Sequence, residues 1–276
     1  MLGYCTNVHS GTSFDDVVSN LRTFSYEVRQ RLQQPLGVGI WFSDIASREV
    51  DLSLLRDTLD ECELTLFTIN GFPFSDFHCE VVQHRVYEPN WCDIRRLRYT
   101  IRLANILAST IDEHEAGIST LPLGWNDASF SDEDAAKMLQ QCIEQLEEIE
   151  QQTSRCIHLD LETEPGCRLQ CSADLCQFVD RSFGDDERVR RYLRVCHDTC
   201  HAAVMRETPE DSIANYNNVG LSIGKVQLSS AIKINFEQIH PENLQNTMDD
   251  LRSIAEPRYL HQTTIYNGSE VAFFEN

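Results

Sequence analysis

Short apolar stretches alternate with longer amphipathic stretches along this chain. Seven apolar runs, rich in β-branched and aromatic residues, span residues 2–8, 37–42, 64–69, 117–121, 156–161, 192–196 and 221–228. They lack the strict alternation of half-exposed strands, which is typical of parallel strands buried on both faces. Between them, residues 14–33, 93–108 and 132–151 carry apolar positions at helical intervals. The repeated alternation of strand and helix predicts βαβ units around a parallel sheet.

Two segments depart from this alternation. Residues 71–90 form a connection longer than a usual βα loop, rich in Phe, His, Tyr and Pro, and we expect it to cover a site. Its His78 and His84 are either substrate contacts or solvated side chains. Near the end, residues 259–265 and 271–274 flank Asn267-Gly268, which predicts a hairpin. We therefore expect one α/β domain over residues 1–276, a TIM (β/α)8-like barrel without a clear last strand.

Composition and charge narrow the classes of function. Hydrophobic residues make up 41% and charged residues 24% of the chain, as in ordinary globular proteins. The 44 acidic against 23 basic residues give a net charge of −21, which disfavours binding to nucleic acid or to an anionic membrane surface. We see no secretory signal and no apolar run of about 18 residues that could insert into a membrane. We expect a cytoplasmic protein whose 11 cysteines are reduced.

Polar residues follow most of the predicted strands, at the end where parallel α/β folds bind ligands. Three consecutive strands end in Glu162, in Asp198 with His201, and in Gln227. Carboxylate, imidazole and amide donors could converge on one divalent cation, Mn²⁺, Co²⁺, Zn²⁺ or Mg²⁺, with positions left for a substrate. Asp198 and His201 can face one centre if a helical turn begins at Asp198. A nearby carboxylate such as Glu164 could then move a proton between carbon atoms.

Other readings of the same region carry less weight. Any α/β sheet has polar residues at its strand ends, so each one alone means little. Cys167, Cys171 and Cys176 are spaced unlike a zinc ribbon or the usual iron–sulfur patterns, which favours structural cysteines. Cys200 and His201 could be a nucleophile and its base, but no third orienting group is evident.

The strand-end motifs resemble those of the EboE-type metabolite traffic proteins. The matching segments are collinear over the chain and comprise residues 2–9, 70–74 with His78, 87–91, 118–124, 161–167, 196–201, 224–230 and 259–262. That family is similar to the xylose-isomerase-like TIM barrels, the superfamily of sugar and sugar phosphate isomerases and epimerases. The resemblance implies this fold, with a divalent metal ion. The relatives continue past the last residue of this sequence, so the chain looks truncated at its C-terminus.

The resemblance also implies a role for individual residues. Glu162 matches a glutamate that binds metal and often moves the proton, and Asp198 with His201 matches an Asp-x-x-His metal signature. Gln227 takes a position usually held by a histidine ligand. The superfamily has a further glutamate on strand eight, for which His261 is the remaining candidate.

Candidates for the other roles come from the remaining strand ends. His9 joins Glu162 and Glu164 as a candidate for proton transfer. The substrate-binding candidates are Asn7, Asn70, His78 and Ser229.

Two functions from different classes are compatible with this sequence. The first is a metal-dependent isomerase or epimerase of a small, sugar-like metabolite that is the precursor of a secondary metabolite. The second is a non-catalytic barrel that binds the metabolite and hands it to partner proteins of the same pathway. Phosphodiester hydrolysis, as in the endonucleases of this superfamily, is a weaker third candidate because the charge of −21 leaves no basic groove for DNA.

Overall fold

The central sheet contains seven parallel strands arranged in chain order. The computed structural model describes residues 1–276 except 77, 79–81, 128–129, 256–259, 269–270 and 276. The strands are β1 (Gly3–Cys5), β2 (Leu36–Trp41), β3 (Leu64–Asn70), β4 (Glu115–Thr120), β5 (Cys156–Glu162), β6 (Leu193–Asp198) and β7 (Ile223–Gln227). Strands β2 and β5 are buried along their whole length, as their continuous apolar runs predict. The predicted parallel α/β sheet is confirmed.

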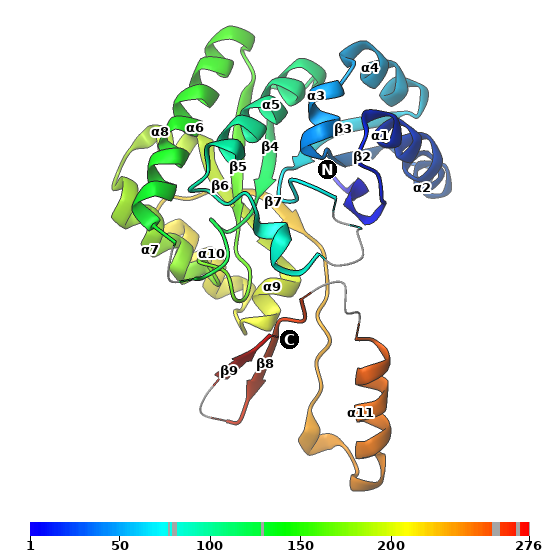
Figure 1. The fold of residues 1–276 in the computed structure, drawn as a ribbon, viewed down its shortest axis with the longest axis vertical. Helices are drawn as coiled ribbons and strands as arrows, with labels where there is room; N and C mark the ends of the chain where they lie inside the picture. The colour runs from blue at the N-terminus through cyan, green and yellow to red at the C-terminus, as the bar shows by residue number, and fades with distance from the viewer. Residues whose placement is uncertain (77, 79–81, 128–129, 256–259, 269–270, 276) are drawn as a thin grey trace.

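The sheet curls but does not close. Figure 1 shows the strands gathered at the centre of the main body, with helices around them. Each strand pairs with its neighbours in sequence, and β1 and β7 stay as the two edges in the described part of the chain. Two register shifts, at Val38/Gly39 and at Val195/Cys196, interrupt the ladders. The fold is therefore a TIM-like α/β barrel in which no eighth strand closes the sheet within the described residues.

Helices connect and cover the strands. They are α1 (Phe14–Asn20), α2 (Tyr26–Leu32), α3 (Asp44–Glu49), α4 (Leu52–Glu61), α5 (Ile94–Thr110), α6 (Asp132–Thr153), α7 (Ser172–Phe183), α8 (Glu187–Tyr192), α9 (Thr199–Val204), α10 (Pro209–Asn218) and α11 (Leu244–Ser253). Short 3₁₀ helices span Thr6–Val8, Gln83–Tyr87, Phe236–Gln238 and Pro241–Asn243. None of the helices in the described residues is long and apolar enough to cross a membrane.

Side-chain caps determine where the predicted helices begin. The Ser131 side chain accepts a hydrogen bond from the Asp134 N–H at 3.2 Å, so α6 begins where its sequence predicts. A full capping box between Ser13 and Asp16 starts α1. The predicted helix over residues 14–33 differs in its middle, where Leu21–Ser25 form a π-helical turn between α1 and α2. An amphipathic pattern does not reveal such a turn because the apolar stripe continues across it.

The long connection after β3 is held by one buried arginine. Arg96, fully buried on α5, donates to the carbonyl of Pro89 at 2.8 Å and to those of Gly71 and Phe72 at 2.8 and 3.0 Å. A single guanidinium thereby ties both ends of the connection to the barrel.

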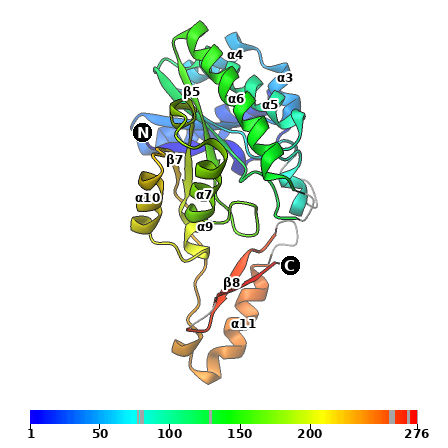
Figure 2. The same ribbon diagram turned by 90° about the vertical axis from the view of Figure 1, so that its left-hand side faces the viewer.

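The chain after β7 leaves the barrel. Figures 1 and 2 show α11 and a hairpin of β8 (Thr263–Tyr266) and β9 (Val271–Phe274) extending from the end of the barrel toward which the strands point. The two strands pair antiparallel, which confirms the hairpin predicted around Asn267-Gly268. Helix α11 has no buried residue, so this extension contributes little to the core.

Candidate functional site

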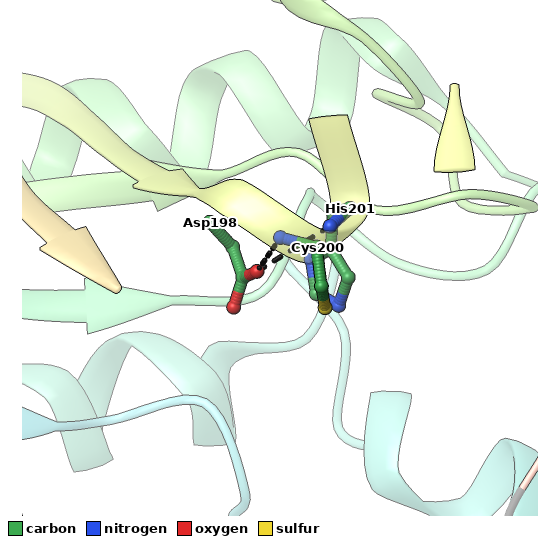
Figure 3. A group of neighbouring side chains, drawn as sticks. All are labelled: Asp198, Cys200 and His201. Atoms are coloured by element: carbon green, nitrogen blue, oxygen red, sulfur yellow. Dashed lines mark hydrogen bonds between the residues drawn. The ribbon is translucent and has the colours of Figure 1, made fainter. Parts of the chain in front are cut away.

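The end of β6 positions two of the predicted ligands. Asp198 is the last residue of β6 and also the N-cap of α9, where its Oδ1 accepts the N–H groups of Cys200 and His201 at 2.8 and 3.3 Å. The expected helical turn at Asp198 is thus present, and it places His201 beside the carboxylate. Ligand atoms of Asp198, Cys200 and His201 lie within 4.8 Å of one another (Figure 3).

Glu162 approaches the same point from the neighbouring strand. It ends β5, is 4% exposed, and its Oε1 lies 3.2 Å from Nδ1 of His201. The same nitrogen lies 3.0 Å from the carbonyl of Thr163, which fixes the imidazole ring. Burial raises the pKa of the Glu162 carboxyl, and the nearby carboxylates of Asp198 and Glu164 add to this against the opposing effect of His201.

His201 and Asp198 shift each other's pKa in the direction that favours the charged form. Burial by itself lowers the pKa of His201, but its hydrogen bond to Glu162 and the surrounding carboxylates hold that pKa well above its usual range. Burial also raises the pKa of Asp198, yet the charge of His201 and the hydrogen bonds from Ser229 and Cys200 outweigh it and lower that pKa. The two shifts have a shared cause, since the positive form of His201 and the ionised form of Asp198 stabilise each other.

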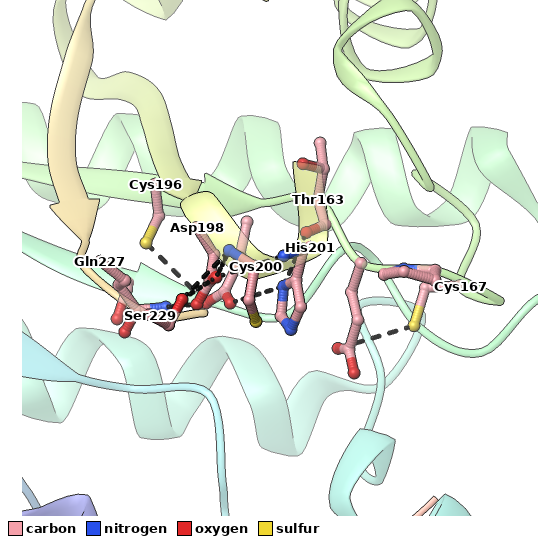
Figure 4. Close-up of polar contacts among 12 residues, drawn as sticks. Thr163, Cys167, Cys196, Asp198, Cys200, His201, Gln227 and Ser229 are labelled. Carbon is pink, nitrogen blue, oxygen red and sulfur yellow. Dashed lines mark hydrogen bonds and ion pairs between the residues drawn. The ribbon is translucent and has the colours of Figure 1, made fainter. Parts of the chain in front are cut away.

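Gln227 and Ser229, which come later in the chain than β6, are further hydrogen-bond donors to Asp198. Gln227, which ends β7, donates from Nε2 to Oδ2 of Asp198 at 3.1 Å. Ser229 donates from Oγ to Oδ1 of Asp198 at 2.5 Å, so it orients a predicted ligand (Figure 4). The structure thus brings Glu162, Asp198, His201 and Gln227 together.

Glu164 is a second buried carboxylate near the end of β5, and it is held by residues distant in sequence. Its Oε1 accepts hydrogen bonds from Tyr87 Oη and from Gln262 Nε2, both at 2.8 Å. Gln262 also donates to the carbonyl of Pro165 at 2.9 Å, which fastens the C-terminal extension to the end of the barrel. Sequence reasoning missed Tyr87 and Gln262, although both lie in segments that carry the EboE resemblance.

These residues surround a cavity of about 230 Å³ at the carboxyl ends of the strands. Its walls are formed by Asn7, Asn70, Phe72, Pro73, Val86, Ser119, Glu162, Glu164, Asp198, His201 and Gln227. Phe72, Pro73 and Val86 come from the long connection, as expected of a segment that covers a site. A cavity of this size fits a small metabolite better than a drug-sized ligand.

The remaining predicted site residues divide into two groups. Asn7 and Asn70 line the cavity, and His78 lies beside it with Nε2 2.9 Å from the carbonyl of Asn7. His9 and His261 do not line it. The ring of His9 instead stacks on Phe24, with 3.8 Å between ring centroids, and its Nε2 lies 2.7 Å from Tyr4 Oη.

Cysteines touch the site as neutral thiols. The Sγ atoms of Cys196 and Cys167 lie 3.8 and 3.9 Å from the carboxylates of Glu162 and Glu164. Burial raises the pKa of both thiols well above its usual range, and burial also raises the pKa of Cys200. A Cys200 nucleophile is therefore disfavoured. The ten cysteines in the described part of the chain form no disulfide.

Lys225 is a further buried polar residue near the cavity that the sequence did not bring to attention. Lys225 lies on β7 two positions before Gln227, and it is 8% exposed. Its Nζ donates to Oδ1 of Asn70 and, at 3.1 Å, to Oγ of Ser119. Strand β7 is otherwise mostly exposed, and its sequence gives no sign that Lys225 is its one buried residue. The signal that could have found it is its place in the 224–230 segment, next to Gln227.

Solved structures of several proteins have this fold. A D-tagatose 3-epimerase-like protein is 14% identical, with a TM-score of 0.55 over 94% of this chain and 88% of its own. A D-allulose 3-epimerase from Methylomonas sp. is 13% identical, with a TM-score of 0.54 over 82% of this chain and 71% of its own. A family 2 AP endonuclease from Brucella melitensis is 15% identical, with a TM-score of 0.52 over 94% and 90%.

These likenesses establish that the chain has a TIM-barrel-like α/β fold. At such low identity they show no more than the fold. No family model and no curated protein matches the sequence. The fold alone does not define a function, because the chemistry of a protein resides in its site.

Proposed function

We propose that this protein is a divalent-metal-dependent isomerase or epimerase of a sugar, sugar phosphate or similar polyhydroxy metabolite. The observation that carries the proposal is the meeting of Glu162, Asp198 and His201 at the wall of a small cavity at the strand ends. Ligands bind at this end of a TIM barrel. The EboE resemblance suggests that the metabolite is a precursor of a secondary metabolite, processed in the cytoplasm.

The donor set suits a hard or borderline cation. Glu162, Asp198, His201 and Gln227 would hold it with oxygen and nitrogen atoms, and His261 is a weaker candidate because it lies outside the cavity wall. Three carboxylates around one cavity, with one imidazole between them, form an anionic centre that a divalent cation would balance. Mn²⁺, Co²⁺, Zn²⁺ and Mg²⁺ all fit this chemistry, and a barrel of similar fold from Mycobacterium smegmatis was solved with magnesium. When bound, such an ion polarises substrate oxygens.

The chain's own carboxylates would move the proton. Glu162 is the stronger candidate for a base because its raised pKa brings the carboxyl closer to neutral pH. Glu164 is the weaker candidate because Tyr87 and Gln262 occupy its Oε1 and the Cys167 thiol lies 3.9 Å from its Oε2. His9 lies outside the cavity wall, and its assistance would require it to move there.

A binding protein is the alternative function. No counterpart of the strand-eight glutamate lines the cavity in the described residues, and the barrel is open between β1 and β7. A pocket that keeps its donors but lacks one ligand would bind a metabolite and deliver it to partner proteins without turning it over. Nucleic acid remains an unsuitable ligand because the net charge is −21, even though an endonuclease has a similar fold.

Metal content and carbon–hydrogen exchange test the proposal together. The dialysed protein is analysed for Mn, Co, Zn, Fe and Mg, then incubated in D₂O with D-allulose and D-fructose after reloading with each ion. We expect close to one equivalent of metal, and deuterium at the carbon beside the carbonyl, detected by NMR. Both should disappear in the Asp198→Asn/His201→Ala double variant.

The outcomes separate the two functions. Equal metal content in the double variant and the parent contradicts the site. Metal and sugar binding without exchange contradicts the isomerase and supports the binding protein. If the protein binds neither a metal ion nor a sugar, both functions are contradicted.

A further inference from the structure

A buried ammonium group lies behind the cavity, where no role has yet been assigned to it. Lys225 does not line the cavity itself, but both residues to which it donates, Asn70 and Ser119, do. Its side chain starts from the edge strand β7 and reaches β3 and β4 across the interior of the curled sheet.

The charge of Lys225 is not cancelled by a direct ion pair. Within the described part of the chain, no carboxylate lies within the 4.0 Å of an ion pair from its Nζ, and both acceptors are neutral. Burying an ammonium group without a carboxylate partner is unfavourable. Such a cation polarises the neutral groups that it contacts, and their own N–H and O–H groups become stronger hydrogen-bond donors. The effect is large because the field of the cation is poorly screened in the protein interior.

The hydrogen bonds fix the direction in which Asn70 presents its amide. An ammonium group can only donate, so Oδ1 of Asn70 must face Lys225. Ser119 Oγ also donates to this Oδ1, at 3.3 Å. The Nδ2 group of Asn70 donates one hydrogen to the carbonyl of Gly39 at 3.4 Å, which leaves its second N–H without a partner in the described residues. Asn70 lines the cavity, so this N–H is available to a ligand.

We propose that Lys225 is a positioning residue that makes Asn70 a polarised donor for the carbonyl oxygen of an α-hydroxycarbonyl sugar. The proposal rests on the proposed function and adds to it the part of the substrate that this wall recognises. The same cavity is lined by the carboxylates Glu162 and Asp198, which accept rather than donate. The cavity thus combines acceptors from β5 and β6 with a donor from β3.

This division matches the movement of charge in an enolisation. A carboxylate takes the proton from the carbon beside the carbonyl, the C–H electron pair forms the C=C bond, and the carbonyl π pair moves onto oxygen. The N–H of Asn70 stabilises the negative oxygen, a preorganised donor being most effective where charge develops. Return of the proton from the carboxylate restores the carbonyl compound, so no other reactant is needed.

The first test needs no substrate. We would record the side-chain amide signal of Asn70 by ¹⁵N NMR, assigned by its loss in Asn70→Asp. Lys225→Met removes the charge and the donor, while Lys225→Gln keeps a donor without the charge. Lys233→Met is the matched control because Lys233 is exposed on the extension. We expect the Asn70 signal to shift in both Lys225 variants and to stay in place in the control.

The second test measures deuterium exchange into D-allulose by the metal-loaded protein. We expect kcat to fall at least tenfold in Lys225→Met with KM changed less than threefold, because the polarised donor acts on charge that develops during reaction. The Lys225→Met/Asn70→Ala double variant should be no slower than Asn70→Ala, since Lys225 acts through Asn70.

The results separate this inference from the proposed function. A parent without exchange contradicts the isomerase function, and the amide signal then decides the positioning role alone. An active parent whose Lys225 variants keep kcat, or change only KM, overturns the inference while the function stands. An unmoved Asn70 signal in well-folded Lys225→Met also overturns it.

Discussion

The hydrogen bond from Ser229 to Asp198 should control metal affinity. Its Oγ donates to Oδ1 of Asp198 at 2.5 Å and accepts the Cys200 N–H at 3.1 Å, so it joins the carboxylate to the first turn of α9. The same hydrogen bond lowers the pKa of Asp198 and thereby favours the ionised form that binds a cation. Ser229→Ala removes this donor without changing a ligand.

The expected magnitude follows from the environment of this hydrogen bond. Loss of a residue that orients a ligand weakens metal binding about 10- to 100-fold, or about 1.4 to 2.8 kcal/mol. Ser229 is exposed, whereas Asp198 is 7% exposed, so water can replace part of the missing donor. We therefore expect the lower end of this range, about tenfold.

Calorimetric titration with Mn²⁺ at neutral pH measures this affinity. Ser230→Ala is the control because Ser230 is the exposed neighbour of the same residue type. An affinity within threefold of the parent in Ser229→Ala, together with a large loss in Asp198→Asn, would refute the orienting role and leave the ligand assignment intact. No loss in either variant refutes the ligand assignment.

Three further changes test how the site is held. Arg96→Met should lower the free energy of unfolding by about 3 kcal/mol or more, measured by urea denaturation, because three carbonyl groups lose a charged donor. Gln262→Ala should release the C-terminal extension and speed its limited proteolysis, since it removes three hydrogen bonds to the barrel end. Asp132→Asn should remove a stabilisation that exists at neutral pH, because hydrogen bonds from Arg168 lower the folded pKa of Asp132. That stabilisation is present above the unfolded pKa of about 4 and is lost as the pH falls through the folded value, so parent and variant should converge in acid melts.

Each change has a control at an exposed residue of the same type, namely Arg98→Met, Gln238→Ala and Asp185→Asn. An Arg96→Met protein as stable as Arg98→Met would mean that water satisfies the carbonyl groups. Unchanged proteolysis of Gln262→Ala would show that other contacts hold the extension. A gap between parent and Asp132→Asn that persists in acid would contradict the ionic origin of the stabilisation.

The strands and most of the site were predictable from sequence for local reasons. A strand buried on both faces, such as β2 or β5, needs a continuous apolar run, and the seven predicted runs overlap the seven strands. Parallel strands end at one side of the sheet, so Glu162, Asp198 and Gln227 had to lie near each other once the strands were placed. The spacing of Asp198 and His201 is that of one helical turn, which α9 supplies.

Only the tertiary structure decided which distant residues join these. Lys225 meets Asn70 across 155 residues, and Gln262 meets Glu164 across 98. Neither contact leaves a periodic signal, because each depends on how far the sheet curls and where the extension returns. His9 shows the reverse case, a polar residue near a strand end whose ring turns to Phe24 instead of the cavity. Sequence therefore determined the helices and strands and the end of the barrel at which the site lies. The curvature of the sheet and the packing of the chain determined which side chains meet at that site. Such contacts depend on distances in space, which local periodicity does not encode.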